Sequence, residues 1–299
     1  MIDRPWSRLS LALVCSAALA CSSAAGPTTT TPPATTPTTP PAATPWTLAW
    51  SDEFDGAAGS PVDASKWSHD VGDGCSSGIC GWGNNEKEYY TSAPENASLN
   101  GQGQLQIVAR EAQPGVSCYY GACRYTSAKI TTRGKMNAAP GRVEARIKLP
   151  AGQGLWPAFW MLGSGFPGVS WPACGELDIM ENKGSQPSSS SSAIHGPGYS
   201  GNTPFAHGNL LPNGMLSDDF HVFGVQWNAD AAQFSVDGVV HYTVSRTELE
   251  QRGSSILDRS YFVILNLAVG GNFDGDPQSN AIFPATMLVD YVRVYSAAK

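Results

Sequence analysis

Charge is scarce in this chain, and positive charge is scarcer than negative. Of 299 residues only 14% are Asp, Glu, Lys or Arg, and 18 basic residues stand against 25 acidic ones, for a formal net charge of −7. The basic residues form no cluster of the kind that binds phosphate groups. This composition excludes nucleic acids and other anionic polymers as partners.

Long helical patterns are also missing. No stretch carries the 3.6-residue apolar period of a long helix, and no internal repeat is evident. Short β-rich runs recur instead. Apolar and charged residues alternate from 143 to 149, and Asp237-Gly238 joins two further runs in the way a tight hairpin turn does. Many such strands predict an all-β fold, an antiparallel two-sheet sandwich.

The N-terminus carries an apolar run, from Leu9 to Ala20, that is too short to span a bilayer. Two arginines precede it, so we interpret residues 1–20 as an export signal. Its ending is open. Ala18-Leu19-Ala20 fits ordinary signal-peptidase cleavage, and Cys21 followed by small residues also resembles the start of a bacterial lipoprotein. We expect a bacterial protein that is either secreted or attached to a membrane through a lipid on Cys21.

A segment with nothing to bury follows the signal. Residues 21–45 are rich in Thr, Pro and Ala, a composition that favours an extended tether. The alternative is a linker without a spacing role. Residues 46–299 suit one large sandwich as readily as two small domains, and we favour one domain, acting as a monomer.

Seven cysteines are present, and two of them lie in or directly after the export signal. Cys75 to Cys80 and Cys118 to Cys123 delimit matching short loops, which predicts two local disulfides in an exported protein. Metal binding by these four is the alternative, disfavoured because the five histidines are scattered. Cys174 is left over and is expected to be a buried free thiol.

The segment 175–182 interleaves three carboxylates with large apolar residues. In a regular strand Glu176 and Asp178 share a face, whereas Glu181 points into the core, where an unpaired charge is costly. One β-bulge between Asp178 and Glu181 brings all three acids onto one face and leaves Leu177 and Ile179 in the interior. The alternative is a solvated acidic face on an edge strand.

The bulged spacing has a chemical meaning. Glu176 and Glu181 would have backbones roughly 13 Å apart, at ~3.3 Å per residue. If each side chain leans inward by roughly 4 Å, the carboxyl groups end about 5 Å apart. That separation is typical of a retaining glycosidase, because an inverting pair needs about 6.5–9.5 Å.

These residues resemble glycoside hydrolase family 16, in its laminarinase-like (endo-β-1,3-glucanase) branch. The run Glu176-x-Asp178-x-x-Glu181 looks like the bulged catalytic signature of that family, and five further blocks follow the family's order. These blocks are residues 81–86 (GWGNNE), 141–146 (GRVEAR), 154–161 (GLWPAFWM), 265–271 (LNLAVGG) and 289–295 (VDYVRVY). The resemblance implies a concanavalin A-like β-jelly-roll sandwich with a concave cleft, a retaining mechanism, a β-glucan substrate and no catalytic cofactor.

Roles follow from the resemblance by position. Glu176 is the expected nucleophile, Glu181 the general acid/base and Asp178 the acid that tunes the pair. Because clustered carboxylates resist ionising together, at least one should keep a proton near neutral pH.

Six further residues are candidates for binding sugar. In the run 155–161 Trp156 and Trp160 share the face opposite the apolar core face, where their indoles could stack on sugar rings. The resemblance places His195 near the acid/base, and puts Trp82, Asn84 and Asn85 at the rim of the cleft. The alternatives are ordinary: indoles covered by loops, a structural histidine and turn-forming asparagines.

Many family members hold a structural Ca²⁺, and the matching positions are Glu53 and Asp290. Two acids far apart in sequence are weak evidence, since Ca²⁺ takes six to eight oxygens. The segment 256–262 lacks the Trp-x-Phe that relatives often carry, which leaves the choice among β-1,3-glucan, mixed-linkage glucan and related polymers open.

Two classes of function fit the chain: a glucan hydrolase or transglycosylase, and a non-catalytic glucan-binding protein on the same sandwich. The three acids discriminate between them, because family binders typically lack them. We therefore expect an exported endo-β-1,3-glucanase.

Overall fold

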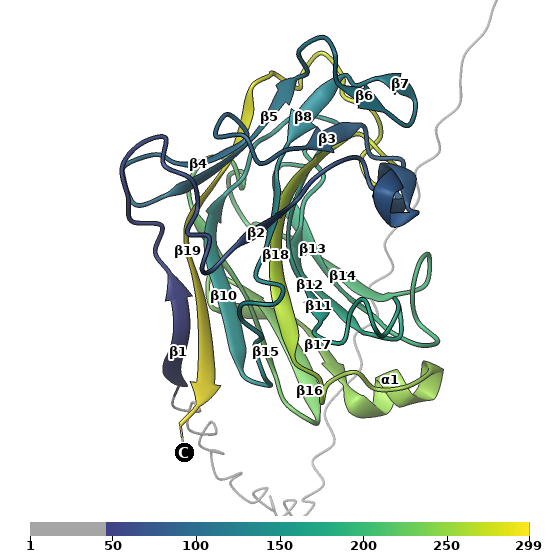
Figure 1. The fold of residues 1–299 in the computed structure, drawn as a ribbon. Coiled ribbons are helices and arrows are strands. Elements are labelled where there is room, and N and C mark those ends of the chain that lie inside the picture. Colours follow the sequence, from purple (N-terminus) through teal and green to yellow (C-terminus); the bar gives the residue numbers. More distant parts are fainter. Residues whose placement is uncertain (1–45, 299) are drawn as a thin grey trace, which may run out of the picture. The chain divides into compact units, whose positions relative to one another are not determined.

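Strands dominate the computed structural model, which describes residues 46–298 (Figure 1). The predicted export signal, Cys21 and the Thr/Pro/Ala-rich segment lie outside the described residues. Among the described residues, none of the helices combines the length and the hydrophobicity that a membrane crossing requires.

The larger of the two main sheets has ten strands. Eight run in the order β17-β16-β15-β10-β19-β5-β8-β3, while β1 pairs with β19 and β4 with β5. In chain order they are β1 (Trp46–Asp52), β3 (Glu88–Tyr90), β4 (Ala97–Leu99), β5 (Leu105–Glu111), β8 (Tyr125–Ser127), β10 (Arg142–Lys148), β15 (His221–Trp227), β16 (Ala231–Val236), β17 (Val239–Ser245) and β19 (Ala285–Ala297). All pairs are antiparallel except β3 with β8.

The second main sheet has seven antiparallel strands in the order β14-β13-β12-β11-β18-β9-β2. Its members are β2 (Ser68–Asp70), β9 (Lys129–Thr131), β11 (Leu155–Gly163), β12 (Glu176–Glu181), β13 (Ser189–His195), β14 (Phe205–Leu210) and β18 (Tyr261–Val269). Figure 1 shows the two sheets as separate layers, one with β10 and β19 and the other with β11 and β18. This confirms the predicted antiparallel sandwich.

The core lies between the layers and follows the period-2 pattern of the strands. Val143, Ala145 and Ile147 of β10 are fully buried, as their alternation predicts. Glu144 between them is also buried, where it accepts a hydrogen bond from the Tyr295 hydroxyl at 3.0 Å and pairs with Arg142. The outer face of this strand is therefore covered at one point where the pattern indicated solvent.

The predicted hairpin turn is present. Val236 pairs with Val239, and Asp237 and Gly238 both have positive φ, 51° and 77°, as a type I′ turn requires. The single α-helix of the described residues, α1 (Arg246–Arg252), was not predicted. A capping box between Ser245 and Glu248 begins it, and it is too short to show an apolar period.

Both predicted disulfides are formed, Cys75–Cys80 and Cys118–Cys123, and Cys174 is buried and free. The first lies in two short 3₁₀ turns, η1 (Cys75–Ser77) and η2 (Cys80–Gly83). The second closes a two-stranded ribbon of β6 (Ser117–Cys118) and β7 (Gly121–Ala122), with Cys123 directly after β7. Asp73 joins the two loops, since its carboxylate accepts the backbone N–H groups of Cys75 and Tyr119.

Candidate active site

The predicted bulge is present in β12. Asp178 pairs with Ala193 and Glu181 with Ser191, so three steps along β12 match two steps along β13. Leu177 and Ile179 are fully buried in the core. The three acids therefore share the outer face of the seven-stranded sheet, which we call the acid-bearing face.

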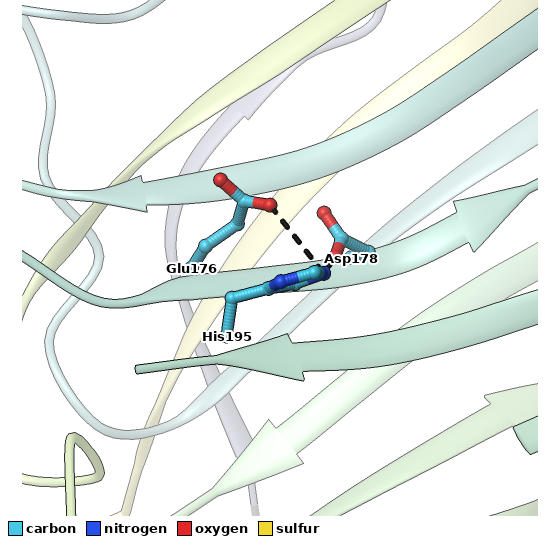
Figure 2. Close-up of side chains that lie close together, drawn as sticks. All are labelled: Glu176, Asp178 and His195. Carbon is cyan, nitrogen blue, oxygen red and sulfur yellow. Dashed lines mark ion pairs between the residues drawn. The ribbon is translucent and has the colours of Figure 1, made fainter. Parts of the chain in front are cut away.

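His195 of β13 lies against two of the acids. It is the cross-strand partner of Glu176, and its Nε2 lies 3.2 Å from Asp178 Oδ2 and 3.8 Å from Glu176 Oε1 (Figure 2). The resemblance placed this histidine near Glu181; its ring lies closest to Glu176 and Asp178, and its charge also acts on Glu181. Its other nitrogen, Nδ1, is buried without a hydrogen-bond partner within residues 46–298.

The three acids are held in conditions that oppose ionisation. Burial, reinforced by the neighbouring Asp178, raises the pKa of Glu176 well above its usual range. Burial raises the pKa of Asp178 to about 8, and burial together with Asp178 raises the pKa of Glu181 to about 8. The side chains of Glu176 and Asp178 are only 16% and 7% exposed, so solvent screens this repulsion weakly. The cluster therefore retains protons at neutral pH.

Trp156 of β11 contacts the third acid directly. Its indole Nε1 donates a hydrogen bond to Glu181 Oε1 at 3.1 Å, which opposes the rise in the Glu181 pKa. The indole also stacks on Phe273, with ring centroids 4.7 Å apart and planes 26° apart. Trp156 lies on the acid-bearing face as predicted, while Leu155 and Phe159 are buried in the core.

Trp160 lies four residues further along β11, on the same face. Its Nε1 donates to Asn266 Oδ1 of β18 at 2.7 Å. Lys129 of β9 is buried beside it, and its ammonium lies 4.9 Å from the Trp160 ring centroid and 4.3 Å from that of Trp82. Sequence reasoning did not identify Lys129 or Asn266, because their contacts join strands far apart in the chain.

The predicted rim residues are engaged with the protein itself. Trp82, with φ of 51°, packs on Tyr90 at 5.5 Å between ring centroids. Asn84 Nδ2 donates to Glu86 Oε1 at 3.2 Å, and Asn85 Nδ2 donates to Asn272 Oδ1 at 2.8 Å. The structure thus connects the Trp82 loop to Trp160 through Lys129, and gives both asparagine amides partners within the chain.

A second pair of acids, which the sequence did not reveal, belongs to the hydrogen-bond network around Trp82 and Trp160. Glu86 and Glu88 are buried, and burial together with the nearby Glu86 raises the pKa of Glu88. Tyr90 donates to Glu86 at 3.2 Å and accepts from Asn266 Nδ2 at 3.1 Å. Since Asn266 also binds the Trp160 indole, this network fixes the aromatic residues of the acid-bearing face.

The two residues proposed for calcium are each paired with an arginine. Glu53 accepts hydrogen bonds from Arg293 at 2.8 and 3.0 Å, and Asp290 from Arg146 at 2.7 Å. Glu53 also lines a cavity of about 220 Å³ that none of the three acids reaches. With both carboxylates bound to guanidinium groups, these side chains do not fit a Ca²⁺ site.

Within residues 46–298, three possible metal-ligating side chains gather at one place, which is Glu176, Asp178 and His195. Their ligand atoms lie within 4.8 Å of one another. Glu176 and Asp178 belong to the catalytic signature that the resemblance identifies, as nucleophile and tuning acid, while the acid/base Glu181 is not one of these three.

Comparison with known proteins gives consistent matches. The model of glycosyl hydrolases family 16 matches residues 84–292. The chain is 38% identical over 261 residues to the glucan endo-1,3-beta-glucosidase A1 of Niallia circulans, a match of 83% of this chain and 37% of that protein. It is also 38% identical to the beta-glucanase of Rhodothermus marinus, covering 84% of this chain and 85% of that one.

Among solved structures, the laminarinase catalytic domain of Thermotoga maritima superposes with a TM-score of 0.80 at 44% sequence identity. The match covers 85% of this chain and 99% of that domain. The described fold is thus that of a laminarinase catalytic domain, and the chain spans little more than a third of the Niallia protein.

Proposed function

This chain belongs to glycosyl hydrolases family 16, and on that premise we propose that it is an exported, retaining endo-glycosidase of internal β-1,3 bonds in β-glucans. One observation carries the proposal: Glu176, Asp178 and Glu181 share one face across a β-bulge, beside His195. The substrate class follows from relatives named for β-1,3-glucans.

In the first step Glu181 donates its proton to the glycosidic oxygen. The Glu176 carboxylate attacks the anomeric carbon, the bond to the leaving oxygen breaks, and a glycosyl ester forms on Glu176. The raised pKa of Glu181, about 8, supports a protonated acid at neutral pH. A protonated Asp178 does not repel the charge on Glu176, and the neighbouring His195 favours the ionised form of Glu176.

In the second step Glu181, now ionised, takes a proton from water. The water oxygen attacks the anomeric carbon, the ester bond to Glu176 breaks, and the product leaves with its original configuration. The chain's own carboxyl groups supply both the nucleophile and the proton transfers.

The test is reducing-end release from laminarin, lichenan, xyloglucan and agarose by the purified residues 46–299. We expect release from laminarin that falls by at least about 10³-fold in Glu181→Gln, since general acid catalysis is worth about 10²–10⁴. Glu176→Ala should abolish turnover while retaining glucan binding. NMR of the first product should show the β-anomer, and an α-anomer would rule out retention.

Two alternatives give different results in the same assay. Faster release from lichenan than from laminarin would indicate a mixed-linkage glucanase, and longer products from short donors would indicate transglycosylation. Glucan binding without release from any polymer would place the chain with non-catalytic glucan-binding proteins. Full activity in Glu176→Ala would contradict the assignment of the nucleophile.

We also propose that the protein is exported and that residues 1–20 are removed. The mature chain is then either secreted or attached to a membrane by a lipid on Cys21. The two disulfides support an oxidising compartment. The intact mass of the mature protein tests this: a chain beginning at Cys21 with a diacylglycerol increment indicates the lipoprotein, and the bare chain indicates secretion.

A further inference from the structure

Phe273 occupies an unusual place for an aromatic residue in a connecting segment. It lies between β18 and β19 and stacks on Trp156, with the ring centroids 4.7 Å apart. The Lys183 ammonium lies 4.8 Å from the centroid of the Phe273 ring. Trp156 and Phe273 are only half-buried. Neither ring belongs to the main hydrophobic core, so core packing does not explain the stack.

The next residue fixes the segment in place. Asp274 Oδ2 accepts the backbone N–H of Gly154 at 2.8 Å and that of Ser185 at 3.0 Å, and Oδ1 accepts the Ser185 hydroxyl. Gly154 directly precedes β11, and Ser185 follows β12 by four residues. One carboxylate thus joins the segment to the two strands that carry Trp156 and Glu181.

Trp156 in turn reaches Glu181, whose carboxylate accepts its indole N–H at 3.1 Å. We propose that Phe273 is a positioning residue for Glu181, which acts by stacking on Trp156 and so holding the indole N–H on the acid/base carboxyl. The inference rests on the proposed function for its catalytic consequence. Its geometric content, the dependence of the Trp156–Glu181 hydrogen bond on Phe273, does not.

The consequence for catalysis is specific to the proton-transfer steps. A hydrogen bond from a neutral donor favours the ionised carboxyl, and Lys183 acts in the same direction, so loss of this alignment raises the pKa of Glu181. The side chains that pair with the nucleophile Glu176 are His195 and Trp171, which are not members of the stack. A misaligned acid slows departure of a sugar, which needs a proton, more than departure of an acidic phenol, which does not.

The experiment compares wild type, Phe273→Leu, which removes the stack but keeps apolar bulk, and Phe273→Tyr, which keeps the ring. Phe283→Leu is the matched control, because Phe283, just before β19, stacks at 4.8 Å between ring centroids on Tyr125 of the ten-stranded sheet. The readouts are the pH profile of kcat/KM on laminarin and the rate on a nitrophenyl β-laminaribioside. A third readout is the pH titration of the Trp156 indole N–H resonance, assigned with Trp156→Phe.

In Phe273→Leu we expect the alkaline limb of the kcat/KM profile to move to higher pH by about half to one unit. Turnover of laminarin should fall about tenfold, and turnover of the nitrophenyl substrate should fall less. The indole resonance should lose its downfield position and its response to Glu181 ionisation. Phe273→Tyr should restore all three, and Phe283→Leu should match wild type.

Equal losses on both substrates with an unmoved limb and an unchanged indole titration would overturn the proposal. If wild type is inert on every glucan, the proposed function fails, and the indole titration alone decides whether Phe273 positions the hydrogen bond.

Discussion

At the scale of single residues, Asp178 stands out because the fold places it where it opposes stability. It is 5% exposed, and burial raises its pKa to about 8. The folded state therefore prefers the protonated form, while the unfolded chain ionises near pH 4. The stability from this group is complete below about pH 4 and is lost as pH rises toward 8.

Replacing Asp178 by Asn should reveal this cost. The amide resembles the protonated acid, so Asp178→Asn should match the wild-type free energy of unfolding near pH 4 and exceed it at pH 8 by an amount on the order of 1–2 kcal/mol, with a correspondingly higher Tm. Glucanase activity should fall, because Asn cannot exchange a proton with its neighbours. Thermal melts from pH 4 to 8 measure the gain, with the exposed Asp55→Asn as control. A lower Tm than wild type at pH 8 would show that Asp178 is a net stabilising group.

At the scale of elements, the Trp82 loop depends on two small disulfide loops for its shape. Gly81, with φ of 59°, lies so close to Tyr119 that a Cβ would sit 3.0 Å from its ring. Tyr119 belongs to the Cys118–Cys123 loop and Gly81 follows Cys80 directly. The two loops therefore support the segment that carries Trp82.

The loss of stability on removing one of these disulfides can be estimated. Each disulfide closes a loop of about five residues, for which the chain-entropy model gives roughly 2 kcal/mol. Cys75→Ser with Cys80→Ser should therefore lower the free energy of unfolding by about 2 kcal/mol and raise KM for laminarin more than it lowers kcat. Urea unfolding and steady-state kinetics measure both, and Ser76→Ala, an exposed substitution in the same loop that leaves the disulfide intact, is the control. A fall in kcat with KM unchanged would mean that the loop acts on the chemistry instead of on binding.

The sequence allowed the β12 bulge to be predicted because burying Glu181 would cost more than adding one unpaired residue. The hairpin at Asp237-Gly238 and both disulfides could also be predicted from the sequence, since each depends on residues close together in the chain. The stack of Phe273 on Trp156 could not be predicted in this way, although an aromatic residue two positions after the 265–271 block was a signal. Its partner lies more than a hundred residues away, and no local pattern encodes that contact.

At the scale of the whole molecule, the same limit applies to strand order. β10 pairs with β15 on one side and β19 on the other, and such crossovers leave no trace in the alternation of a single strand. The strand pattern and the resemblance both predicted the sandwich, and the spacing of the acids predicted the face that carries them. Together they located the three acids, whereas the ion pairs of Glu53 and Asp290 came only from the folded chain.

The last whole-molecule feature is a histidine pair where edge strands of the two sheets meet. His207 of β14 and His241 of β17 lie 6.2 Å apart between ring centroids, and His207 also stacks on Tyr242 at 5.2 Å. Burial, then repulsion from His207, lowers the pKa of His241 to about 4. The folded state therefore favours neutral His241.

Acid should loosen this edge in a defined window. An unfolded histidine takes up its proton near pH 6.5, so the stability that neutral His241 contributes is complete above that pH and is lost as pH falls toward 4. His241→Gln, which does not titrate there, should lose less Tm than wild type between pH 7 and pH 4. His207→Gln should recover only part of the difference, because burial is the larger cause of the shift. Parallel Tm curves for wild type and His241→Gln would show that groups other than His241 govern acid unfolding.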